Sequence, residues 1–260
     1  ITSDVRGFVG DMGGLIGVFK GTNLSVTGNT ITVDEISQEN GDLGRLTGGL
    51  IGRVDQKNTT VTVKNNAKIT VTIVHTDVVR EEHYYAGLIA YIAGSKSVID
   101  VSENKNVTVK ISGKKLIDKY NIGGMIGALC GEQTLTMNGN KCDVEIQYSE
   151  GSDSGNIGGM AGAISGGYNN PTPVTMNSNT LDCSISTPNW GGAMIGSVVG
   201  KLSGLDKSLT TVSCSSNTLR GSGITFKEGN KTVGLLVGWA LGDGGNANIG
   251  PKWNDIVLYK

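Results

Sequence analysis

The chain has 260 residues, and 22 lysines and arginines oppose 23 aspartates and glutamates, which gives a formal net charge of -1. This balance excludes a general electrostatic grip on nucleic acid or on an anionic membrane surface. Glycine supplies 41 residues and proline only 4, so the glycine content does not indicate collagen or a low-complexity linker. No apolar run reaches the roughly 18 residues that span a bilayer, and no transmembrane segment is predicted.

A glycine-bounded apolar motif recurs along the chain. It occupies residues 13–17, 48–52, 86–90, 123–127, 158–162, 192–196 and, in a looser copy, 234–238. Small residues without alternation favour a strand that is packed on both sides or one that another backbone approaches closely. The third position of the motif predicts one internal ladder of large apolar side chains, formed by Leu15, Leu50, Leu88, Met125, Met160, Met194 and Leu236. The spacings along this ladder are 35, 38, 37, 35, 34 and 42 residues.

A second motif keeps the same period, with an apolar residue three positions before an asparagine. The asparagines are Asn29, Asn66, Asn104, Asn140, Asn179 and Asn217. Alternating β-branched stretches such as residues 69–73 follow them, which predicts half-buried strands. Asparagine tolerates the left-handed conformation and satisfies backbone groups at a tight corner. Stacked amides also bond to one another, so we expect a structural asparagine ladder.

The two phased motifs predict an all-β fold, a parallel β-helix (β-solenoid) of about seven coils of roughly 36 residues. Three strands are expected to close each coil, in a right-handed turn, with coils about 4.8 Å apart. A single domain spans 1–260, with repeats at 7–44, 45–83, 84–120, 121–155, 156–188, 189–230 and a partial or capping repeat at 231–260. A second inner ladder is expected from Val33, Val71, Val109, Val144 and Cys183.

With these residues laid out, the chain resembles two related families over about residues 7–240. The glycine motif is similar to the GLUG motif of bacterial surface proteins and IgA-peptidase-type exoproteins. The phased pair of motifs also resembles the G-G-A-[IL] and F-x-x-N repeats of chlamydial polymorphic outer membrane proteins, which are autotransporter passengers. This chain has Val, Met or Cys where the second family has Phe. Both resemblances imply adhesion, display or scaffolding at a cell surface, and neither brings catalytic residues.

The candidates for chemistry are few. The acids Asp34, Glu35, Asp143, Glu145 and Asp182 fall on or beside predicted strands. The last three, on adjacent coils, would suit a cation or a sugar, whereas the alternative interpretation is a solvated strand face. A loop containing His83, Tyr84 and Tyr85 is a predicted contact patch. Glycine motifs that repeat in register indicate a structural role. No catalytic residue, cofactor or metal ion is predicted.

Two further residue sets bear on the environment of the chain. Cys130, Cys142, Cys183 and Cys214 are expected to be mostly buried free thiols. A Cys142–Cys183 disulfide is the alternative. It is disfavoured because the two residues follow their repeat asparagines at different distances, so that they lie diagonally and not directly over each other. Glycosylation sequons occur at Asn23, Asn58, Asn106 and Asn230, and they matter only in a secretory pathway that glycosylates.

The leading hypothesis is a non-enzymatic extracellular or surface protein, structural or adhesive, whose partners are copies of itself stacked head to tail or a cell-surface glycan or protein. The second hypothesis is a carbohydrate-active β-helix, a polysaccharide lyase or hydrolase, with an acidic groove across neighbouring coils. The third is an ice-binding solenoid, motivated by the T-x-T segments at 30–32, 60–62 and 70–72.

Overall fold

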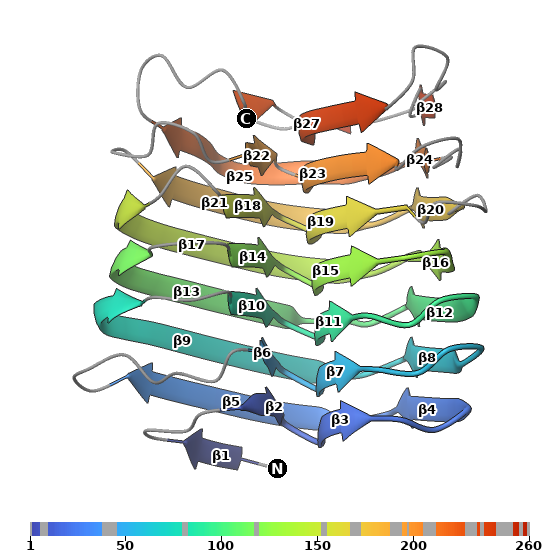
Figure 1. The fold of residues 1–260 in the computed structure, drawn as a ribbon. Coiled ribbons are helices and arrows are strands. Elements are labelled where there is room, and N and C mark those ends of the chain that lie inside the picture. The colour runs from blue at the N-terminus through green and yellow to red at the C-terminus, as the bar shows by residue number, and fades with distance from the viewer. Residues whose placement is uncertain are drawn as a thin grey trace.

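The computed structural model describes most of the chain as β-strands and the tight turns between them. The described residues are 2–5, 10–37, 46–79, 83–116, 120–151, 155–166, 173–187, 194–196, 198–204, 212–226, 233–234, 237–242, 252–254 and 257–258. Their strands pair in parallel and stack along one axis (Figure 1). The predicted all-β parallel solenoid is therefore confirmed. No helix among these residues has the length and apolarity needed to cross a membrane.

Two of the four sheets form the broad outer walls of the coil. Sheet A contains β1 (Thr2–Val5), β5 (Thr30–Ser37), β9 (Lys68–Val79), β13 (Val107–Leu116), β17 (Lys141–Gly151), β21 (Thr180–Thr187), β25 (Thr218–Phe226) and β29 (Val257–Leu258). Sheet D contains β4 (Asn23–Thr27), β8 (Thr60–Lys64), β12 (Ser97–Ser102), β16 (Gln133–Thr136), β20 (Val174–Asn177), β24 (Val212–Ser215) and β28 (Lys252–Asn254).

The other two sheets form an inward fold of the coil. Sheet B contains β2 (Asp11–Gly13), β6 (Leu46–Gly48), β10 (His83–Ala86), β14 (Tyr120–Gly123), β18 (Gly155–Gly158), β22 (Met194–Gly196) and β26 (Val233–Gly234). Sheet C contains β3 (Ile16–Phe19), β7 (Ile51–Val54), β11 (Ile89–Ile92), β15 (Ile126–Cys130), β19 (Ala161–Ser165), β23 (Val199–Gly204) and β27 (Val237–Gly242).

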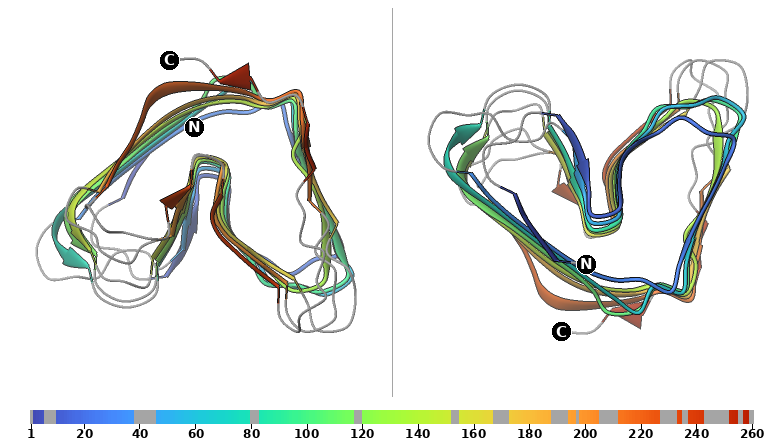
Figure 2. Two further views of the ribbon diagram at one scale, coloured as in Figure 1. Left: turned by 90° about the horizontal axis from the view of Figure 1, so that it is seen from above. Right: turned by 90° about the horizontal axis from the view of Figure 1, so that it is seen from below.

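One coil passes through sheets B, C, D and A in that order, as β2 to β5 do in the first coil. The coil therefore contains four strands, and the prediction of three was wrong. The error came from the glycine motif, which was interpreted as one strand and is in fact a corner between two. Seen from the C-terminal end, the chain runs counterclockwise as it climbs toward the viewer, so the turn is right-handed (Figure 2).

The glycine corner brings sheets B and C face to face along an inward fold, which we call the seam (Figure 2). A Cβ atom built on Gly52 would lie 2.6 Å from the Met12 carbonyl oxygen and 2.7 Å from that of Gly17. A Cβ atom on Gly162 would lie 2.6 Å from the Ile122 nitrogen. Such distances leave no room for a side chain. Glycine is favoured here because two backbones pack against each other, and Ala90 of the third coil is the largest residue at this position.

The core fills the space enclosed by the four sheets, and each of them contributes buried apolar side chains to it. In sheet A, Val33, Val71, Val109, Val144 and Cys183 occupy one register column, and all are buried. This column forms the second inner ladder that the alternating stretches predict. Polar residues between these positions face outward, which accounts for the period of two in the sequence.

Candidate functional site

The six predicted asparagines stack in one continuous ladder at the corner between sheets D and A. In each interior step the amide oxygen accepts two hydrogen bonds from the asparagine one coil earlier. For Asn140 these come from the backbone N–H of Asn104 at 3.1 Å and from its Nδ2 at 3.0 Å. Asn140 Nδ2 in turn donates to the Asn179 Oδ1 at 3.0 Å and to the Val101 carbonyl at 2.8 Å.

This pattern uses all four hydrogen-bonding positions of the Asn140 amide. Asn66, Asn104 and Asn179 repeat it with their own neighbours. The ladder amides from Asn66 to Asn217 are buried, and a buried amide without partners would be costly. The ladder therefore ties each coil to the coils on both sides.

The left-handed residue at this corner is one position earlier than predicted. Positive φ angles occur at the residue before every ladder asparagine: Gly28, Asn65, Glu103, Gly139, Ser178 and Ser216. The ladder asparagines themselves are not among the positive-φ residues of the described chain. Their role is to place an amide in the stack, so the backbone twist falls on the preceding residue, whatever its type.

The apolar ladder at the seam apex contains Leu50, Leu88, Met125 and Met160, all fully buried, and a half-buried Leu15 at the first coil. Successive members are joined through the backbone, as in the 3.1 Å bond from Leu88 N to Met125 O. Leu236 lies outside the described residues. The predicted sixth member, Met194, does not belong to the ladder.

Met194 pairs instead with Asn156 inside sheet B and is only half-buried. The ladder position is taken by Val198, whose carbonyl accepts the Met160 N–H at 2.9 Å. The true sixth motif is therefore residues 196–200, Gly-Ser-Val-Val-Gly, and not residues 192–196. The uneven spacings of 34 and 42 residues become 38 and 38, which is the signal that the sequence offered.

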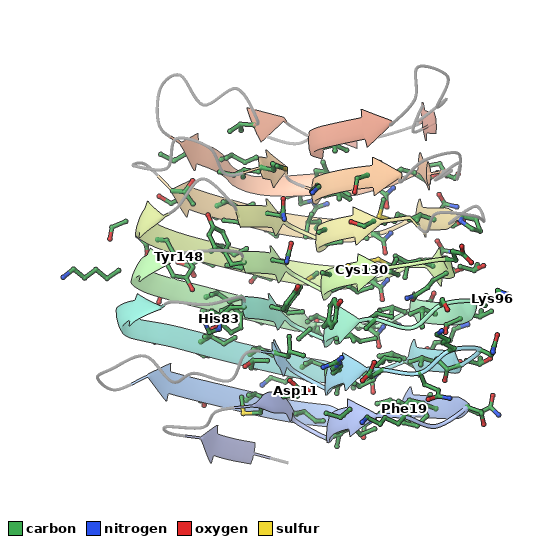
Figure 3. The ribbon with its side chains drawn as sticks, viewed as in Figure 1. Asp11, Phe19, His83, Lys96, Cys130 and Tyr148 are labelled. Atoms are coloured by element: carbon green, nitrogen blue, oxygen red, sulfur yellow. The ribbon has the colours of Figure 1, made fainter. Side chains whose placement is uncertain are left out.

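The predicted contact loop is also wrong, because His83, Tyr84 and Tyr85 form strand β10 of sheet B. His83 and Tyr85 are buried, and Tyr85 Oη lies 3.0 Å from His83 Nδ1 (Figure 3). Only Tyr84 remains partly exposed, at the mouth of the seam. The charged residues before this segment gave it the composition of a loop, whereas its register with Leu46 on one side and Tyr120 on the other makes it a strand.

Tyr84 belongs to a surface cluster that the sequence did not reveal, the Tyr–Arg cluster of Asp11, Arg53, Asp55, Tyr84 and Tyr91. The rings of Tyr84 and Tyr91 lie 4.5 Å apart between centroids, across the seam. The Arg53 guanidinium carbon lies 5.8 Å from the Tyr91 ring centroid. Arg53 also approaches the carboxylates of Asp55 at 3.2 Å and Asp11 at 3.9 Å. Arg53 and Tyr91 each directly follow a glycine motif, so an alignment of the repeats places the two residues side by side on adjacent strands.

The acidic candidates are only partly brought together. Asp143 and Asp182 are register neighbours on adjacent strands of sheet A, and both are exposed. Partial desolvation and the Asp182 carboxylate raise the pKa of Asp143. Glu145 pairs with Lys110, with Nζ and Oε2 3.4 Å apart. Asp34 lies three strands away from Asp143 in the same sheet, and the side chain of Glu35 is outside the described part.

A pocket of about 270 Å³ opens farther along the same strands of sheet A. Its lining residues come from three successive coils and are Ser112, Gly113, Gln147, Tyr148, Ser149 and Ser186. Figure 3 labels Tyr148 at this end of the sheet. The pocket depends on which strands lie side by side, so the sequence pattern alone gave no sign of it.

The four cysteines are free thiols, and Cys142, Cys183 and Cys214 are buried. Cys142 pairs with Leu181 and Cys183 with Val144, so the diagonal offset that disfavoured a disulfide is real. Burial raises the pKa of Cys142 well above its usual value and that of Cys183 to about 12. Such thiols stay protonated at neutral pH and are poor nucleophiles.

The remaining sequence candidates are scattered. The T-x-T segments 30–32 and 70–72 lie in sheet A, whereas 60–62 lies in sheet D, so they share no single face. The sequon residues Asn23, Asn58 and Asn106 are exposed, and Asn230 lies outside the described residues. In the part of the chain that the structure describes, no three His, Cys, Asp or Glu side chains gather as a metal site would require.

Comparisons of the chain with family models, with curated proteins and with solved structures find no match.

Proposed function

We propose that this chain is a non-enzymatic structural or adhesive repeat module that works at a cell surface or outside the cell. The observation that carries the proposal is the saturated asparagine ladder. The buried amides of the ladder form hydrogen bonds between successive coils, and the seam joins the same coils through backbone packing. A rod built this way holds its outer faces in fixed positions, which suits display and attachment.

The placement of the reactive side chains supports the same proposal. His83 is buried against Tyr85, and the thiols of Cys142 and Cys183 are held protonated in the core. The outward residues include the Tyr–Arg cluster, whose tyrosine and arginine content is typical of interface hot spots. The histidine and the buried thiols thus contribute to the core, and the aromatic and charged side chains of the Tyr–Arg cluster lie on the surface, where a partner would contact them.

The test combines electron microscopy with an adhesion assay on the full chain. Negative-stain images across a concentration series distinguish single short rods from fibres of uniform width. Fluorescently labelled protein is added to intact cells and to immobilised polysaccharides, and the reaction mixtures are assayed for new reducing ends. We expect rods or fibres that bind without cleaving. Release of oligosaccharides, or rods that neither assemble nor bind, would count against the proposal.

A further inference from the structure

The pocket on sheet A has a physical origin in the strands that surround it. Gly113 of β13, the register partner of Tyr148 of β17, adds no side chain to this part of the sheet, and the Tyr148 side chain is itself fully buried. The pairing of β13 with β9 also shifts register between Gly113 and Lys115. Such bulges bend a strand and redirect its side chains, and they are frequent beside functional sites. The short side chains of Ser112 and Ser186 leave the entrance open on both sides of Gln147.

The lining of the pocket is uncharged and rich in hydrogen-bonding groups. Within the described residues, the side chains of Ser112, Gln147 and Ser186 make no hydrogen bond to the protein. The Ser149 hydroxyl donates to the Lys114 carbonyl at 2.7 Å. A hydroxyl or a side-chain amide both donates and accepts. The pocket therefore presents paired donors and acceptors rather than a charge.

The polar lining continues beyond the pocket in a row parallel to the solenoid axis. Ser112, Gln147, Ser186 and Thr225 are successive register partners on β13, β17, β21 and β25. Adjacent strands lie about 4.8 Å apart, so this row extends over about 14 Å. On the N-terminal side the row ends at Val74, the register partner of Ser112 on β9. A linear polar ligand would find matching groups in four consecutive coils.

We propose that this pocket and its polar row bind a neutral saccharide, one sugar ring in the pocket and the rest of the glycan along the row. The inference rests on the proposed adhesive function and names its ligand class. Sugar hydroxyls both donate and accept, as the lining groups do. A purely apolar ligand would desolvate several polar groups without replacing their bonds to water. A charged ligand would meet no charged side chain among the lining residues.

The experiment measures binding of the full chain to defined oligosaccharides by isothermal titration calorimetry. The neutral probes are cello-, malto-, xylo- and manno-oligosaccharides, and the acidic probe is an oligogalacturonate. An extended neutral peptide of similar length is included. We expect at least one neutral oligosaccharide to bind, and Gln147→Ala or Ser186→Ala to weaken that binding about 3- to 10-fold each. Ser186→Phe, which fills the entrance, should abolish it.

The matched control is Ser25→Ala, which removes an exposed serine hydroxyl from sheet D and should bind as the wild type does. Circular dichroism melting of every variant separates loss of binding from loss of fold. Tighter binding of the oligogalacturonate or of the peptide would overturn the ligand class. A saccharide whose affinity is unchanged in Gln147→Ala and Ser186→Phe would overturn the site.

The same variants in the adhesion assay distinguish this inference from the function on which it rests. If wild type and Ser186→Phe adhere to cells equally, the pocket is not the adhesive site, and the proposed function survives. If Ser186→Phe loses adhesion together with saccharide binding, both proposals are supported. If the wild type binds no saccharide and also neither adheres nor assembles, both proposals fall.

Discussion

Two corners of each coil are built in opposite ways. The corner between sheets D and A is held by side chains, because each interior ladder asparagine bonds to the coils before and after it. The seam corner between sheets B and C is held by close packing of backbone against backbone, which the absence of large side chains allows. Both corners join the coils along the axis, one through amide hydrogen bonds and the other through close packing.

The difference explains how strictly each corner restricts its sequence. Only an amide offers the two donors and the acceptor that the ladder uses, and all six ladder positions carry the shorter one, asparagine. The seam requires only small size, and Ala86 and Ala90 replace glycines of the third motif. The hydrogen bonds of the ladder therefore restrict which residue can stand at its corner, whereas the close backbone packing of the seam restricts only how large the residue can be.

The largest expected effect comes from adding volume at the seam. In Gly162→Val the Cβ atom would lie 2.6 Å from the Ile122 nitrogen and 2.6 Å from the Gly127 carbonyl oxygen, and two further methyl groups would follow. Because backbone atoms on both sides cannot move without separating sheets B and C, we expect a loss of about 5 kcal/mol or failure to fold. Urea unfolding followed by circular dichroism measures the loss.

The control for this change is Ala90→Gly, at the equivalent position of the third coil. It removes volume where the seam already accepts a methyl group, so its effect should stay within about 1 kcal/mol. A tolerated Gly162→Val would mean that the sheets do not pack backbone to backbone, and the contrast between the corners would disappear.

The next largest effect comes from removing one amide from the ladder. Asn140→Ala deletes four hydrogen bonds: it removes the side-chain partner of the Asn104 N–H and of the Val101 carbonyl, and one of the two partners of Asn104 Nδ2 and of Asn179 Oδ1. We expect a loss of about 3 to 4 kcal/mol, measured by urea unfolding. Asn140→Asp should also destabilise at neutral pH, since a carboxylate cannot donate to the Val101 carbonyl or to Asn179.

The matched control is Asn29→Ala at the first rung of the ladder. Asn29 is half-buried, and its amide donates only to Asn66 and to the exposed Thr27 carbonyl. Its loss should cost about 1 kcal/mol. Equal costs at Asn29 and Asn140 would show that the ladder stabilises through local turn formation and not through stacking.

The features that depend only on the repeat period could be predicted from the sequence. The solenoid, the asparagine stack and the valine column follow from residues that recur at one spacing, because equivalent residues of successive coils must lie over one another. Even the exchange of Met194 for Val198 was visible in the uneven spacing. The asparagine position was predictable as well, since no other residue in that motif carries an amide in every copy.

Features that depend on the direction of the backbone or on neighbouring strands were not predictable. A glycine motif has no side-chain alternation, so the sequence does not show that the chain reverses inside it. The residues with positive φ at the asparagine corner include Gly28, Glu103 and Ser178, which share no chemistry. The Tyr–Arg cluster and the pocket both bring together side chains from different coils, and their geometry needs the strand register.

The smallest expected effect concerns the thiols that pack at the two corners. Cys142 Sγ lies 3.7 Å from the Gly124 carbonyl at the seam, and Cys214 Sγ accepts a hydrogen bond from Asn217 Nδ2 at 3.0 Å in the ladder. Burial raises the pKa of Cys214 to about 12 and that of Cys142 well above its usual value of 9.0. Both folded-state pKa values thus exceed the unfolded one.

A raised thiol pKa means that the folded state holds its proton more tightly than the unfolded state does. The contribution of the thiols to stability should therefore be constant below about pH 9 and fall between about pH 9 and 12, as the unfolded chain ionises first. Cys142→Val and Cys214→Met, which match apolar residues of their own columns, should each flatten this fall in urea unfolding measured across that range. If only Cys142→Val did so, the ladder amide would be stabilising the Cys214 thiolate, and the corners would differ in electrostatics as well as in packing.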